Sequence, residues 1–297
     1  MLDGQIAVMF CSDSAVNCLE SDMLAPSNVS LPFFSYGIFQ PGELSHFRIR
    51  RFVTGTSTAW VKGGLRLRDG LLIADPGGSD RIAGVVLTFD PATASDAYDA
   101  IAELEPKSQY RWEEVQTTSG RANILWGVSP KKGSNALDSE WSSWDDPLFT
   151  DAIDLVFETV EANTAWEWDT KQAFRVQMAY LLLWNSIERY VSLRYHLGGD
   201  ATQKVLKLAE EPAFAEGLRR LSTEERSVQR ADQPQTRLKF DRNDPKAAVN
   251  YYYQVRSNMV HRGKSMPRDH RIVVESCSEL VALFKHVLAQ AKSEATT

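Results

Sequence analysis

The sequence contains few cysteines and histidines, and this scarcity excludes several classes of protein. Only three cysteines, Cys11, Cys18 and Cys277, occur in 297 residues. They are too few and too scattered for a disulfide framework. Their spacing relative to the five histidines matches no zinc-binding pattern. We therefore expect free thiols, no metal site and no cofactor.

Long hydrophobic runs are also missing. No stretch of eighteen apolar residues occurs, so a membrane-spanning helix is not expected. Residues 1–30 lack a basic segment followed by a long apolar one, which is the pattern of a secretory signal peptide. These absences predict a protein of the cytoplasm without a membrane partner.

The chain has no surplus of basic charge. Its 33 Lys and Arg residues stand against 39 Asp and Glu, a net charge of −6. Broad, nonspecific binding to nucleic acid depends on surplus cations that neutralise phosphates, so this mode is not expected. Local basic clusters are present, one of five residues and a looser one of seven: Arg256, Arg262, Lys264, Arg268 and Arg271, then Arg219, Arg220, Arg226, Arg230, Arg237, Lys239 and Arg242.

The distribution of apolar residues changes along the chain and predicts two domains. Residues 31–128 alternate short apolar runs with Asp-Gly, Gly-Gly and Ser-Gly turns, which is typical of strands and hairpins. Within them only Ala92–Leu104 has a helical pattern. Residues 131–147 are polar and contain Gly and Pro, as linkers do. We predict an extension at 1–30, a β-rich domain at 31–130, a linker at 131–147 and a helical domain at 148–297.

Helical periodicity begins after the predicted linker. Between Thr170 and Tyr195, apolar residues recur at steps of three and four, as an amphipathic helix requires. Similar patterns predict helices at 149–163, 202–221, 245–261 and 272–291, which would form a bundle. The charged segment Ser222–Asn243 has little apolar content and is predicted to be a mobile loop. The fold class is therefore α+β.

The first strand is followed by a turn that carries a family resemblance. Tyr36, Gly37, Ile38 and Phe39 follow the apolar residues Phe33 and Phe34. This turn resembles the Tyr-Gly-x-Leu turn of the γ-glutamylcyclotransferase-like family, with Phe39 in place of the usual Leu. The resemblance implies a small β-barrel-like domain. It also implies that backbone N–H groups of the turn hold a substrate carboxylate, an arrangement that glycine permits.

The resemblance continues for about a hundred residues. In the family, a Leu-Asp-x-x-Glu motif is followed by a Tyr; here Ile101, Ala102 and Glu105 stand in the motif and Tyr110 is the Tyr. The Asp has been lost to Ala102. Glu105 would act as general acid and base while the substrate's α-amino group attacks its γ-carbonyl and releases 5-oxoproline. This role requires a carboxyl group with a raised pKa in a desolvated pocket.

A second motif lies in the predicted helix at 245–261. Arg256 and His261 are five residues apart, and their surroundings resemble the Arg-x4-6-His motif of HEPN (Apea-like) domains. Leu181–Tyr195 resembles an earlier helix of that family, with a Trp and an internal Glu. The resemblance implies a metal-independent endoribonuclease and a homodimer formed through the helical domain. His261 would be the acid or base, and Arg256 would stabilise the phosphorane charge.

This motif differs in two ways from what a regular helix and the family pattern would give. Five helical residues turn about 500°, which leaves Arg256 and His261 about 140° apart, so we expect the helix to loosen near Gly263. A polar Asn commonly follows the Arg in the family, whereas here Ser257 follows and Asn258 comes next. Asn258 is therefore the candidate for the supporting contact with the substrate.

Three functions are compatible with the sequence. The first is an RNA-cleaving effector of a stress or phage-defence system, regulated by an amino-terminal domain that binds a small γ-glutamyl-like molecule. The second is a cyclotransferase whose helical domain only forms the dimer. The third is a binding protein without catalysis. The sequence favours the first, because the Arg-x4-His motif keeps both chemical residues while the cyclotransferase motif has lost one acid.

Overall fold

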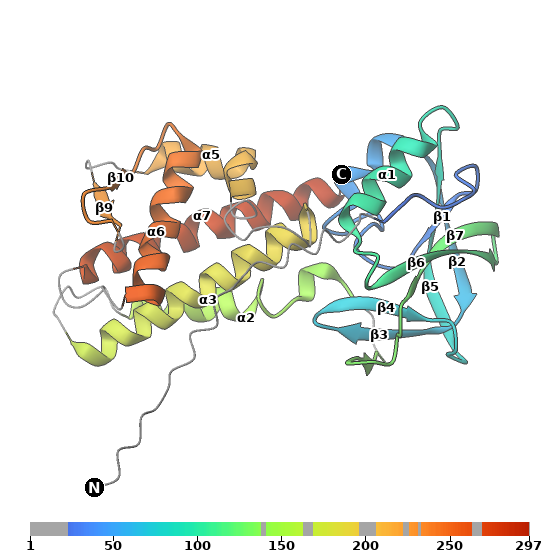
Figure 1. Ribbon diagram of the computed structural model, residues 1–297, viewed down its shortest axis with the longest axis horizontal. Helices are drawn as coiled ribbons and strands as arrows, with labels where there is room; N and C mark the ends of the chain where they lie inside the picture. The colour runs from blue at the N-terminus through green and yellow to red at the C-terminus, as the bar shows by residue number, and fades with distance from the viewer. Residues whose placement is uncertain are drawn as a thin grey trace, which may run out of the picture.

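The computed structural model describes residues 23–137, 141–162, 169–195, 206–221, 226–230, 233–262 and 269–296, with only the backbone for 261 and 262. Residues 23–137 form a β-rich part and residues 141–296 a helical part, which lie side by side (Figure 1). This mixed α/β content and the helical carboxyl-terminal region confirm the coarse fold prediction.

A five-stranded sheet forms the centre of the β-rich part. Its strands have the order β2-β5-β1-β7-β6. The central strand β1 is antiparallel to β5 and parallel to β7. The strands are β1 (Phe33–Ser35), β2 (Val53–Lys62), β5 (Arg81–Phe89), β6 (Tyr110–Thr117) and β7 (Gly120–Gly127).

Side chains of β1 point alternately to two hydrophobic cores because successive residues of a strand face opposite sides of the sheet. Phe33 lies in a core with the helix α1 (Ala94–Leu104), which covers one face. Phe34 lies in a second core on the opposite face, together with residues of strand β4. Both rings are almost completely buried, so β1 is enclosed on both sides.

A three-stranded sheet covers the second face of the five-stranded sheet. It has the order β4-β3-β8, from β3 (Gly64–Arg68), β4 (Leu71–Asp75) and β8 (Asn135–Ala136). Strand β8 lies in the segment predicted as a linker, and its pairing with β3 makes part of that segment ordered structure. The short runs of this segment have no apolar alternation, so the pairing left no signal in the sequence.

The prediction of a barrel-like domain was wrong in one respect, because the described residues contain no closed barrel. Strands β2 and β6 remain the two edges of the five-stranded sheet. They meet near the turn after β6, where the Thr118 amide donates to the Trp60 carbonyl at 3.3 Å and the Trp60 amide donates to the Thr118 hydroxyl at 3.2 Å. The Ser119 hydroxyl also donates to the Thr58 carbonyl at 3.2 Å. These contacts do not make the continuous ladder of backbone hydrogen bonds that closure requires.

The helical part is built around α3 (Thr170–Arg194). Its start agrees with the prediction, and the Asp169 carboxylate caps it by accepting from the Gln172 amide at 3.2 Å. Tyr180 and Trp184 of this helix are fully buried, as are Tyr251 and Tyr252. The other helices are α2 (Asp151–Glu161), α5 (Pro212–Arg220), α6 (Pro245–Arg262) and α7 (His270–Thr296).

The segment predicted as a mobile loop, 222–243, contains a hairpin in its described portion. Strands β9 (Ser227–Gln229) and β10 (Arg237–Lys239) pair in antiparallel register. Val228 is buried and anchors the hairpin to the helical core. Val228 and Phe240 are the buried apolar residues in the described part of this segment. Two such residues, twelve positions apart among many charged ones, give no visible alternation, which explains why the prediction failed.

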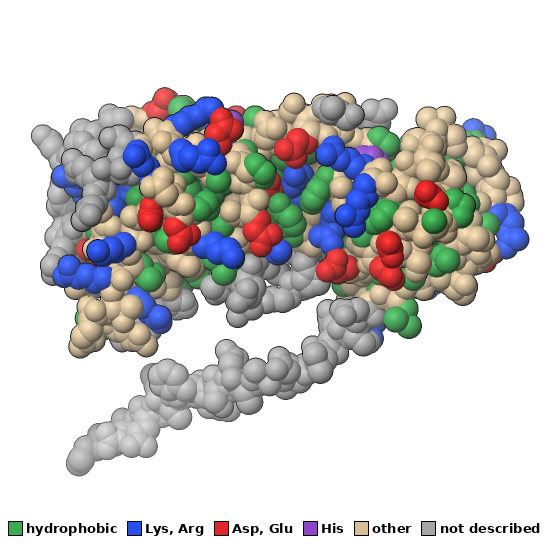
Figure 2. Space-filling model, turned by 90° about the horizontal axis from the view of Figure 1, so that it is seen from above, with side chains coloured by type: hydrophobic (Ala, Val, Ile, Leu, Met, Phe, Trp, Pro, Cys, Tyr) green, Lys and Arg blue, Asp and Glu red, His purple; other side chains and the backbone are tan. Residues whose placement is uncertain are grey.

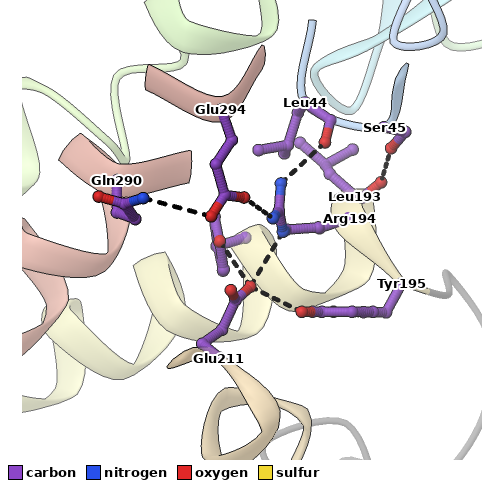
Figure 3. Close-up of polar contacts among 9 residues, drawn as sticks. Leu44, Ser45, Leu193, Arg194, Tyr195, Glu211, Gln290 and Glu294 are labelled. Carbon is purple, nitrogen blue, oxygen red and sulfur yellow. Dashed lines mark hydrogen bonds and ion pairs between the residues drawn. The ribbon is translucent and has the colours of Figure 1, made fainter. Parts of the chain in front are cut away.

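A buried cluster of charges joins the two parts (Figure 3). The Arg194 guanidinium of α3 donates to Glu211 at 2.9 Å, to Glu294 at 3.2 Å and to the Leu44 carbonyl at 3.3 Å. The same oxygen of Glu211 accepts from the hydroxyls of Tyr190 and Tyr195, each at 2.7 Å. Leu44 belongs to the β-rich part, so the cluster spans the junction.

Further contacts attach the carboxyl-terminal end of α3 to the β-rich part. The Ser45 hydroxyl donates to the Leu193 carbonyl at 2.5 Å, and Arg48 donates to the Tyr195 carbonyl at 2.9 Å. The Trp144 indole donates to the Gly42 carbonyl at 2.8 Å and is buried in the helical core. We therefore expect the two parts to move little relative to one another.

The surface carries no extended area of one charge sign on the face seen in Figure 2, where basic and acidic side chains are interspersed. Any nucleic-acid contact on this face would therefore have to be local. Among the described residues, no helix is both long and apolar enough to cross a bilayer.

Candidate functional site

The turn after β1 forms one wall of a small internal cavity, which we call the Glu105 pocket. Tyr36, Gly37, Ile38 and Phe39 all line it, and the three larger side chains are buried. The N–H groups of Ile38 and Phe39 make no backbone hydrogen bond among the described residues. They therefore remain available as donors to a ligand.

Among the described residues that line the Glu105 pocket, Glu105 has the only acidic side chain. It follows the last residue of α1, where the backbone becomes extended and turns the side chain inward. Its side chain is buried, and this burial raises the pKa of the carboxyl from its ordinary value of 4.5 to about 8. Burial disfavours the charged form of an acid, so Glu105 can both hold and release a proton near neutral pH.

Two tyrosines flank this carboxyl. Burial, together with the charge of Glu105, raises the pKa of Tyr36 and of Tyr110. The Tyr36 hydroxyl donates to the Leu125 carbonyl at 2.6 Å, and the Tyr110 hydroxyl donates to the Leu72 carbonyl at 2.9 Å. Both phenol protons are thus directed to backbone oxygens, and both tyrosines shape the pocket as neutral groups.

The Glu105 pocket has a free volume of about 30 Å³. A cavity of this size holds one or two water molecules, since each needs roughly 10–15 Å³. A larger groove of about 990 Å³ adjoins it and shares Tyr36, Leu72 and Trp141 with it. Trp141 is half-buried, so its displacement would open the pocket toward the groove.

The structure brings together the six candidate site residues of the first resemblance. Tyr36, Gly37, Ile38, Phe39, Glu105 and Tyr110 line the same cavity. Ala102 of α1, which stands where the family has Asp, is buried in the core, and neither it nor Ile101 lines the cavity. Sequence reasoning missed Leu71, Leu72 and Trp141, because no motif distinguishes two leucines of a strand or a tryptophan in a polar segment.

The second predicted site lies on α6. The Arg256 guanidinium is about three-quarters buried and lies 3.6 Å from the Glu188 carboxylate of α3. It also lies over the ring of Tyr253, which packs edge-on against Trp184. Glu188 and Trp184 are the internal Glu and the Trp of the segment that resembles the earlier HEPN helix. The structure therefore places that segment against Arg256.

His261 lies in the last turn of α6, and its side chain is outside the described residues. The helix continues to Arg262, and Gly263, near which the sequence predicts loosening, lies outside the described residues.

Asn258, predicted to contact substrate, connects α6 to the hairpin. Its side chain is buried and donates to the Gln229 carbonyl of β9 at 2.8 Å, and it accepts from Gln254 at 2.9 Å. These bonds fix the hairpin to α6. A contact of Asn258 with the substrate stays a prediction.

We compared the chain with known proteins. No family model matches it, and the search of curated proteins gave no match. Among solved structures, an uncharacterized protein of Pyrococcus horikoshii aligns with 24% identity over 36% of this chain and 86% of its own, with a TM-score of 0.29. We infer nothing from a likeness of this size.

No potential metal centre is visible in the described part of the chain, where no three or more His, Cys, Asp or Glu side chains converge.

Proposed function

We propose that the Glu105 pocket of the β-rich part is the active site of a γ-glutamylcyclotransferase-type enzyme, with Glu105 as the group that carries the proton. The observation that carries this proposal is the buried Glu105 carboxyl, whose pKa of about 8 suits proton transfer near neutral pH. It lies in one cavity with the turn Tyr36–Phe39, as the resemblance implies. A cyclotransferase-like fold for this part belongs to the same proposal.

The proposed reaction uses these groups in sequence. The N–H groups of Ile38 and Phe39 bind the α-carboxylate of a γ-glutamyl compound. Glu105, ionised, accepts a proton as the substrate's α-amino nitrogen attacks the γ-carbonyl carbon. It then returns that proton to the leaving nitrogen as the original C–N bond breaks. The products are 5-oxoproline and a free amine, and no water is consumed.

The test is the release of 5-oxoproline from a panel of γ-glutamyl dipeptides and γ-glutamylamines. Because Glu105 must be ionised to accept the proton, we expect the rate to rise with pH through about 8. A γ-glutamyl compound is larger than the 30 Å³ cavity, so a lining side chain must move before it can bind. We therefore expect a low rate with small amides, which gain little binding energy to drive this movement. No release from any member of the panel, across this pH range, would refute it.

A second candidate function, RNA cleavage by the helical part, rests on Arg256. The Arg256 guanidinium contacts Glu188 of α3 and the ring of Tyr253. Arg256 and His261 both belong to α6. An oriented, permanently charged guanidinium can stabilise the pentavalent phosphorane. Under this proposal the helical part is a HEPN-type, metal-independent endoribonuclease that acts on RNA as a homodimer, with the β-rich part as its regulator.

This second proposal is tested with mixed RNA in EDTA, which removes metal-dependent nuclease contaminants. We expect the native protein to cut, and Arg256→Ala and His261→Ala each to lower the rate about 100-fold, the usual effect of removing one group that stabilises a transition state. Arg271→Ala is the matched control, since Arg271 pairs with Glu275 on the surface of α7. If all four proteins cut equally, the activity is a contaminant and the proposal fails.

A further inference from the structure

Helix α3 carries two adjacent charged residues that face different candidate sites. Glu188 pairs with Arg256 of α6 at 3.6 Å. The next residue, Arg189, donates to Asp146 at 2.8 Å, in the segment that connects the β-rich part to α2. Neighbouring residues of a helix leave its axis about 100° apart, so one turn of α3 contacts Arg256 on one side and the segment of Asp146 on another.

Arg189 lies directly on the turn between β3 and β4. Asp69 and Gly70 form this turn with φ values of 50° and 74°, the left-handed conformation of a tight hairpin. A Cβ atom added to Gly70 would lie 2.1 Å from the Nη2 atom of Arg189. The backbone conformation therefore favours glycine here, and any larger residue would displace the end of the Arg189 side chain.

The same turn leads into the Glu105 pocket. Leu71 and Leu72 follow Gly70, and both line the cavity. The Leu72 carbonyl accepts the Tyr110 hydroxyl, while Leu71 packs into the core of the helical part. Arg189 is also close enough to Tyr110 for its charge to act on the pKa of that phenol, against the larger effect of burial. A ligand that moves Leu71 or Leu72 must therefore move the support of Arg189.

We propose that α3 couples the two sites: occupation of the Glu105 pocket shifts the β3–β4 turn, displaces Arg189, and through the adjacent Glu188 changes the position of Arg256. This inference rests on the proposed functions, since it gives the pocket ligand a means to regulate the RNA site. The path runs from Leu72 to Gly70, Arg189, Glu188 and Arg256.

The contacts on this path are suited to rearrangement. The Nη2 atom of Arg189 is buried and has no hydrogen-bond partner among the described residues, so displacement of the guanidinium breaks only its bond to Asp146. At 3.6 Å, the Arg256–Glu188 ion pair is longer than a direct hydrogen bond. Small shifts of packed helices are a common form of coupling between sites.

Gly70→Ala tests this inference without knowledge of the ligand, because its methyl group displaces the flexible end of Arg189. Gly133→Ala is the matched control: Gly133 has φ of 63° and no atom within 4 Å of an added Cβ. The two variants share the backbone strain and differ in the contact with Arg189. We expect amide hydrogen exchange of residues 245–262 to be about ten-fold faster in Gly70→Ala than in Gly133→Ala.

Two further comparisons separate the path from a general loss of stability. Residues 212–220 of α5 serve as an internal reference and are expected to exchange equally in both variants. In an Arg189→Ala background, Gly70→Ala is expected to cause no further change in α6, since the displaced group is gone. Equal exchange of 245–262 in the two glycine variants would overturn the coupling.

RNA cleavage by the same variants distinguishes failure of this inference from failure of the proposed function. If the exchange of α6 changes and no variant cuts RNA, the coupling stands and the ribonuclease proposal fails. If the native protein cuts RNA, while Gly70→Ala and Gly133→Ala cut equally and exchange equally, the ribonuclease proposal stands and the coupling is refuted.

Discussion

Glu105→Gln is expected to abolish 5-oxoproline release while making the protein more stable above about pH 5. Glutamine keeps the shape of the side chain but cannot carry a proton between two nitrogens, so the rate should fall about 10²- to 10⁴-fold. The amide also cannot ionise in the buried pocket, which removes an energetic cost that the carboxyl bears. Loss of activity with a gain in stability is typical of a group maintained for chemistry.

The sign of the stability effect follows from proton binding. Burial raises the pKa of Glu105 to about 8 in the folded protein, against 4.5 for an unperturbed carboxyl. Between these values the folded state binds more protons than the unfolded state, so the free energy of unfolding falls as pH rises. The contribution is constant below about pH 4.5 and above about pH 8. Over the window the loss is on the order of 5 kcal/mol.

The measurement is urea unfolding of the native protein and of Glu105→Gln at several values between about pH 5 and pH 9. The difference in free energy should grow with pH and level off near pH 8, where the carboxyl of the folded native protein ionises. Glu103→Gln is the control, because Glu103 is two residues away with a side chain 68% exposed. A difference that does not change with pH would mean that Glu105 is not a buried acid.

Arg194→Met is expected to destabilise the protein by about 3–5 kcal/mol, the usual cost of removing one partner of a buried ion pair. Methionine retains much of the apolar volume, so the loss is mainly electrostatic. Glu211 would be left buried with its charge balanced only by the hydroxyls of Tyr190 and Tyr195. The Leu44 carbonyl of the β-rich part would lose its donor from α3.

Chemical unfolding again supplies the measurement, with Arg271→Ala as the control for a surface pair. Arg271 has a side chain 71% exposed, and such pairs are worth less than about 1 kcal/mol. Arg194→Met combined with Glu211→Leu should recover most of the stability, since no buried charge then remains unpaired and the Glu294 carboxylate, 35% exposed, is solvated by water. Equal effects of Arg194→Met and Arg271→Ala would show that the junction does not depend on the buried cluster.

Local patterns in the sequence predicted the elements well where the pattern was long. The apolar spacing of residues 170–195 predicted α3 to within one residue at its end, and the turn after Phe33 and Phe34 predicted the wall of the Glu105 pocket. Short elements with a single buried residue, such as the hairpin of β9 and β10, were missed. Two or three residues carry too little periodicity to be distinguished from a charged loop.

The sequence by itself determined the change from a β-rich part to a helical part and the position of α3, and it identified six residues that line one cavity. These features depend on neighbours in the chain: periodicity, turn residues and short motifs. Only the tertiary structure decided that Glu105 is buried enough to titrate near neutral pH, that Asn258 is engaged by a hairpin, and that Arg189 rests on Gly70. Each depends on groups far apart in sequence that meet only when the chain is packed, and burial and electrostatic interactions are properties of that packing.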